Sequence, residues 1–97
     1  MTFAVTRTRG PGWKRSQPME AQPDWEAHRA FMNGLVAEGY VTLGGPLPGT
    51  HDVLLIMNAS TPDEIRTRLG DDPWAAQNIL VVKSIQPWDV RLGSLRS

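Results

Sequence analysis

The sequence predicts an α+β fold with a four-stranded antiparallel sheet, on three observations. Four short runs are rich in β-branched and aromatic residues, as in strands. Two longer segments carry apolar residues at helical spacing or a helix start signal. Clusters of glycine and proline separate these segments. A chain of 97 residues has room for one core, so residues 1–97 are expected to form a single domain.

The first half of the chain predicts a strand, a long loop and a helix. The strand spans residues 2–9, with Arg7 on the same face as its apolar neighbours. Gly10-Pro11-Gly12 ends it and begins a loop to about residue 23, which we expect to be too polar to pack and either mobile or functional. The helix spans residues 24–38, and Gly39 is suited to end it.

The second half predicts a hairpin, a second helix and a last strand. Strands over residues 40–43 and 52–58 pair through a turn over residues 44–49. Thr61-Pro62-Asp63-Glu64 is a helix start that combines a capping threonine with proline at the first position, and this helix ends near residue 70. A short helical turn begins at Asp72-Pro73, and a strand spans residues 80–85. The order β-α-β-β-α-β is the ferredoxin-like arrangement, in which two helices cover one face of the sheet.

Composition excludes several classes of function. Ten basic and ten acidic residues cancel, so we expect no nucleic-acid partner and no membrane partner. The absence of cysteine excludes disulfides and thiolate catalysis. The two histidines lack a metal-ligand spacing, and no glycine-rich phosphate loop precedes a helix, so we expect neither metal nor cofactor. No signal peptide or long apolar run is visible, which predicts a cytoplasmic protein.

His28 is the first candidate for chemistry. On a helical wheel it lies at the centre of an apolar stripe formed by Trp25, His28, Met32, Leu35 and Val36. An inward-pointing imidazole is either a hydrogen-bonded core residue or a working acid/base group.

Asp72 is the second candidate. It precedes a rigid proline turn, where it could cap the short helix, pair with the His28 ring, or do both, because a carboxylate has several lone-pair sites.

The chain resembles the YciI-like (YCII-related) family over nearly its whole length. The resemblance is carried in order by Trp25-Glu26-Ala27-His28-Arg29-Ala30-Phe31-Met32, Gly44-Gly45-Pro46-Leu47, Asp72-Pro73-Trp74 and Ile85-Gln86-Pro87-Trp88. It implies a dimeric α+β barrel with His28 and Asp72 as the active-site pair. It also implies chemistry near that of a dehydrochlorinase of a chlorinated hydroxyquinol, lactone isomerases and cofactor-free monooxygenases.

Further residues are candidates for substrate binding. Arg7 is expected near the pocket entrance as an anion-holding group, while Arg9, Lys14 and Arg15 face solvent. The other candidates are aromatic, flexible or turn residues, which would equally suit a core, an interface or a tight turn: Trp25, Met32, Gly45, Pro46, Leu47 and Trp74.

Two functional hypotheses follow. The first is a small cofactor-independent enzyme, with lyase or isomerase chemistry on a small aromatic or acidic metabolite, in which His28 is the general acid/base and Asp72 fixes its tautomer. The second is a non-catalytic binding or regulatory module that uses the same pocket. In either case the apolar runs over residues 53–57 and 79–82 leave both sheet faces apolar, which predicts a homodimer packed through the sheet faces.

Overall fold

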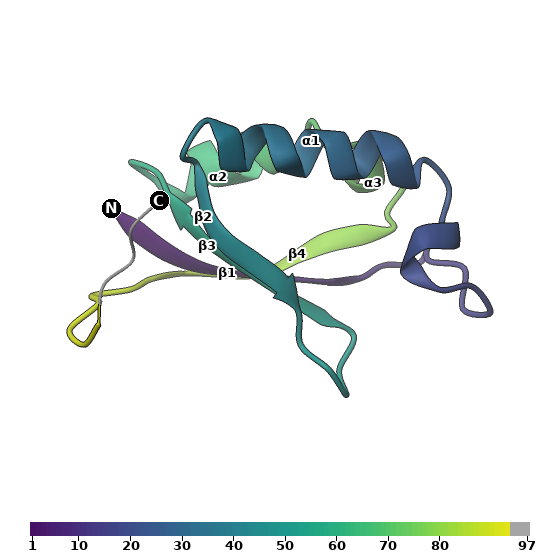
Figure 1. Cartoon of the computed structure of the whole chain (residues 1–97), viewed down its shortest axis with the longest axis horizontal. Helices are drawn as coiled ribbons and strands as arrows, with labels where there is room; N and C mark the ends of the chain where they lie inside the picture. Colours follow the sequence, from purple (N-terminus) through teal and green to yellow (C-terminus); the bar gives the residue numbers. More distant parts are fainter. Residues whose placement is uncertain (94–97) are drawn as a thin grey trace.

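The computed structural model describes residues 1–93 and contains the predicted antiparallel sheet, with strand order β2-β3-β1-β4 (Figure 1). The strands are β1 (Thr2–Arg9), β2 (Val41–Pro46), β3 (Asp52–Asn58) and β4 (Leu80–Pro87). The helices are η1 (Met19–Ala21), α1 (Trp25–Ala37), α2 (Pro62–Leu69) and the short α3 (Pro73–Ala76). The predicted α+β class and element order are confirmed.

The α-helices all lie on one face of the sheet, and the opposite face carries none (Figure 1). On the helix side, alternate β1 residues Phe3, Val5 and Arg7 are buried. The partners of Phe3 and Val5 in β3 are Met57 and Leu55, which are buried on the same side. The core therefore fills the layer between helices and sheet. Within the described residues, no helix has the length and apolar character needed to span a bilayer.

The hairpin differs from its prediction. β2 continues through Gly44 and Gly45 to Pro46, so the turn occupies residues 47–51 and not 44–49. Proline is tolerated there because β2 is an edge strand that needs no donor on its outer side. A register shift between Val41 and Leu43 accompanies this longer strand.

The prediction that the loop over residues 10–23 is too polar to pack is wrong. Trp13 is buried in an aromatic cluster with Trp74. Gln22, 3% exposed, ties the loop together: its carbonyl oxygen accepts from the Lys14 backbone N–H, and its amide donates to the Lys14 and Gln17 carbonyls. One buried side chain thus replaces the regular hydrogen bonds that this loop lacks.

We expect Gly12→Ala to destabilise the fold by about 1–3 kcal/mol, because a Cβ at Gly12 would lie 2.0 Å from the Gln77 carbonyl oxygen. Gly34→Ala is the matched control: no atom lies within 4 Å of its added Cβ, and alanine favours helices, so a gain of about 0.5–1 kcal/mol is expected. Urea unfolding measures both changes. Equal stability of the Gly12 variant and the wild type would contradict the close packing.

Candidate active site

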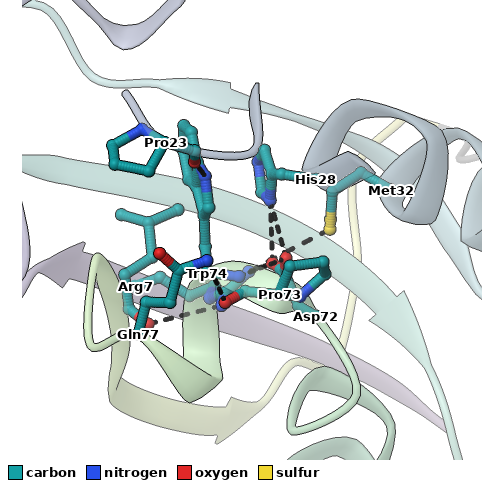
Figure 2. Close-up of polar contacts among 9 residues, drawn as sticks. Arg7, Pro23, His28, Met32, Asp72, Pro73, Trp74 and Gln77 are labelled. Carbon is teal, nitrogen blue, oxygen red and sulfur yellow. Dashed lines mark hydrogen bonds and ion pairs between the residues drawn. The ribbon is translucent and has the colours of Figure 1, made fainter. Parts of the chain in front are cut away.

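Asp72 is fully buried at the start of α3 and forms the centre of a hydrogen-bonded network (Figure 2). Its Oδ1 accepts from the Trp74 backbone N–H at 3.0 Å. Its Oδ2 accepts from Arg7 Nη1 at 2.8 Å, and His28 Nδ1 lies 3.0 Å from Oδ1 and 2.8 Å from Oδ2. Asp72 therefore caps α3 and contacts His28 at once, so the two interpretations of this residue hold together.

The contact with Asp72 determines which nitrogen of the His28 ring can accept a proton or a hydrogen bond from a ligand. A carboxylate accepts, so Nδ1 carries the hydrogen and the lone pair of a neutral ring lies on Nε2. Among residues 1–93, Nε2 has no hydrogen-bond partner, and it is not among the buried unpaired atoms. Because His28 also lines a cavity, Nε2 is open to a ligand there.

The network keeps Asp72 ionised. Burial by itself raises the pKa of the Asp72 carboxyl, since it penalises the charged form. Hydrogen bonds from His28, the Trp74 backbone and Arg7 outweigh burial and leave the pKa below its ordinary value. Asp72 is therefore a fixed negative charge beneath the His28 ring.

The Trp74 ring packs against one face of the His28 ring. The two rings stack with centroids 3.8 Å apart and planes 4° from parallel. Trp74 is itself fixed, because its Nε1–H donates to the Pro23 carbonyl at 2.6 Å (Figure 2). The Trp13 ring also packs edge-on against it at 5.8 Å. The stacked Trp74 ring and the Asp72 carboxylate together fix the plane of the His28 ring.

Arg7 does not lie at the pocket entrance, contrary to prediction. It is 1% exposed, and its charge is paired with Asp72. Its Nη2 also donates to the Leu80 carbonyl at 3.4 Å, whereas Nε has no partner among the described residues. Strand alternation identified the correct face, but β1 carries Arg7 under the helices, where the nearest anion is a side chain of the protein.

The cavity above His28 has a volume of about 240 Å³. The predicted catalytic residue His28 lines it, as do most of the predicted binding residues: Arg7, Trp25, Met32, Gly45, Pro46 and Trp74. Leu47 does not, because β2 extends to Pro46 and leaves Leu47 in the exposed turn. Asp72 does not line the cavity, because it is buried beneath the wall, where it contacts His28.

The prediction missed several polar residues of the wall: Arg9, Asn33, Thr50, His51 and Asp52. Strand alternation could have identified Arg9, which shares the helix-side face of β1 with Arg7. His51 comes from a connecting segment, where no periodicity indicates direction. Val36, predicted to be buried, is 50% exposed because it borders the cavity and not the packed core.

A comparison of the whole chain with solved structures identifies proteins of similar fold. The chain shares its fold with a dehydrochlorinase. The similar structure is 5-chloro-2-hydroxyhydroquinone dehydrochlorinase from Burkholderia phenoliruptrix AC1100 in complex with 2,5-dihydroxybenzoquinone. The TM-score is 0.67 at 22% identity, covering 92% of this chain and 94% of that one. No protein-family model and no curated protein matches the sequence. The likeness supports the α+β fold.

We expect Asp72→Asn to lower the unfolding free energy at pH 7 by about 3 kcal/mol, since it leaves the buried Arg7 cation without its counter-charge. The folded-state pKa of Asp72 is lowered, so its stabilisation is complete above the unfolded value of about 3.9 and is lost as pH falls through the folded value. The difference between wild type and variant should therefore shrink below about pH 4.

Urea unfolding between pH 7 and pH 2 measures this difference. Asp71→Asn is the control, because Asp71 is the exposed neighbour in sequence and its loss should change stability by less than about 0.5 kcal/mol. A gap between Asp72→Asn and wild type that stays constant down to pH 2 would contradict the assigned role of the Asp72 charge.

Proposed function

We propose that this chain is a small, cofactor-independent enzyme of the YciI-like family in which His28 is the general acid/base. One observation carries the proposal: His28 Nδ1 is held by the buried Asp72 carboxylate, which leaves Nε2 open to the cavity. A general base needs this pairing of a fixed orientation with an accessible lone pair. Asp72 is a positioning residue that sets the tautomer and stabilises the imidazolium.

The proposed reaction is an elimination or an isomerisation on a small aromatic or acidic metabolite. In the elimination, Nε2 takes a proton from the substrate, and the electron pair of the broken bond to hydrogen forms a new double bond. The bond to the leaving group breaks with its electron pair, which leaves as an anion such as chloride. In the isomerisation, the imidazolium returns the proton to another atom. Both reactions need proton transfer alone, which suits a site with a single working histidine.

The fold and the cavity agree with this proposal. The structural neighbour is named for the removal of hydrogen chloride from a chlorinated hydroxyquinol. In this chain, Trp25 and Met32 give the wall beside His28 an apolar character that suits a planar ring. His28 is 8% exposed, so it is shielded from bulk water without being sealed off, which supports catalysis over a purely structural role.

The functional unit is proposed to be a homodimer packed through the open sheet face. Leu54 lies partly exposed on that face, because it pairs with Thr6 on the side of β1 opposite the buried residues. Leu43 adds an apolar side chain that is 52% exposed. The helices cover only the other face (Figure 1), and a second copy would bury this one.

We expect His28→Gln to lower the rate of chloride release from 5-chloro-2-hydroxyhydroquinone at least about 100-fold, since it removes the base but keeps a polar side chain of similar size. Chloride release is followed against a protein-free blank. Arg66→Gln, on the exposed surface of α2, is the control and should retain the wild-type rate. Binding of this compound without catalysed chloride release would favour the non-catalytic binding module.

We expect Leu54→Glu to convert the proposed dimer to a monomer, because it places a charge in the centre of the open face. Sedimentation equilibrium at low micromolar concentration gives the mass, and Thr67→Glu on the exposed side of α2 is the matched charge control. A folded wild-type monomer at that concentration would refute the dimer.

A further inference from the structure

Arg9 and His51 lie opposite each other at the end of the sheet that borders the cavity. The β1–β3 ladder pairs Thr8 with Asp52, and the next step joins the Arg9 backbone N–H to the His51 carbonyl at 3.2 Å. Side chains at opposed ladder positions point to the same side with Cβ atoms about 4.5–5.5 Å apart. Both residues line the cavity, so that side is the one that His28 faces.

The charges of the cavity wall are paired, with one exception. Arg7 pairs with Asp72, Arg29 with Glu26 and Asp52 with Lys83. Arg9 has no ion pair within the part of the chain that the structure describes, and the histidine opposite it supplies no negative charge. The cavity mouth therefore holds an unbalanced positive charge, although the chain as a whole is neutral.

The Arg9 guanidinium is also held in position. It lies 4.3 Å from the centre of the Trp13 ring, and Trp13 is buried against Trp74. Stacking occupies the face of a guanidinium and leaves its N–H edge free for a bidentate carboxylate.

Two basic side chains opposed on a sheet repel each other when both are charged, and a bound anion removes that cost. Arg9 and His51 also border an outer depression with Gly10 and Arg15.

We propose that Arg9 and His51 form an anion-binding subsite and that the ligand is a small aromatic carboxylic acid. This assignment rests on the proposed function and names its substrate class. The carboxylate is held at the mouth by Arg9 and His51, and the ring lies along Trp25 and Met32 with a reactive position toward His28 Nε2. A cavity of about 240 Å³ suits a single-ring compound. Arg7 cannot hold the carboxylate, because Asp72 already neutralises it.

The test compares probes that differ in one property each, with tryptophan fluorescence or calorimetry as the readout. Benzoate and benzamide have the same shape but differ in charge, and acetate lacks the ring. The wild type should bind benzoate about tenfold more tightly than benzamide, as expected for one charge-assisted hydrogen bond at an accessible site. Acetate should bind more weakly than benzoate. Added salt should reduce the preference for benzoate, because the mouth is exposed.

Substitutions of Arg9 and His51 test whether these residues cause the preference for benzoate over benzamide. Arg9→Gln should abolish the preference for benzoate over benzamide, and His51→Gln should reduce it. Arg9→Lys keeps the charge without the planar fork and should retain part of it. Arg66→Gln is the matched control, because Arg66 is exposed on α2 and lines neither the cavity nor the outer depression. It should bind both probes as the wild type does.

Three results would overturn the subsite: equal affinity of the wild type for benzoate and benzamide, no binding of benzoate, or an unchanged preference in both Arg9 variants. Acetate binding as tightly as benzoate would overturn the aromatic assignment. These results are separate from chloride release by the His28 variants, so failure of the subsite and failure of the proposed acid/base role can be distinguished.

Discussion

The buried Asp72 carboxylate is the interaction on which the rest of the site depends. It joins Arg7 on β1, His28 on α1 and the first turn of α3, elements that are far apart in the chain. A carboxylate withdrawn from water needs donors, and these three elements supply them. The position of α1 over the sheet and the orientation of the His28 ring are therefore set by the same two oxygen atoms.

Two arginines on the same face of β1 differ in their surroundings, because Asp72 neutralises only the first. Arg7 balances the buried charge and is unavailable to a ligand. Arg9 lies two residues further along the same face of β1. It is no longer beneath the helices, and it lines the cavity mouth. The period of a strand thus places one cation beneath the histidine and one where an anionic ligand would enter.

Local pattern predicted much of the fold and part of the site. The capping signals gave α2 and α3, and the apolar stripe of α1 pointed His28 inward. Spacing could not predict the partner of Arg7, because that pair joins residues 65 positions apart. The packing of the loop over residues 10–23 was also missed, since Gln22 bonds the Lys14 backbone and Trp74 packs against Trp13 through contacts that no periodicity encodes. Leu47 was misplaced because glycine and proline were interpreted as a turn where they continue an edge strand.

The geometry around Arg7 argues that the network is arranged for orientation rather than for stability. Burying a guanidinium and a carboxylate together contributes little net stability, because desolvation offsets their attraction. The Arg7 Nε–H has no partner among the described residues, an additional cost of about 1–3 kcal/mol for a buried donor. A β-bulge shifts the β1–β4 register between Thr6 and Arg7, and beyond it Nη2 meets the Leu80 carbonyl. An apolar residue at position 7 would avoid these costs but would leave the Asp72 charge unbalanced beneath His28. The imperfect arginine site therefore serves to balance the buried Asp72 charge that orients the His28 ring.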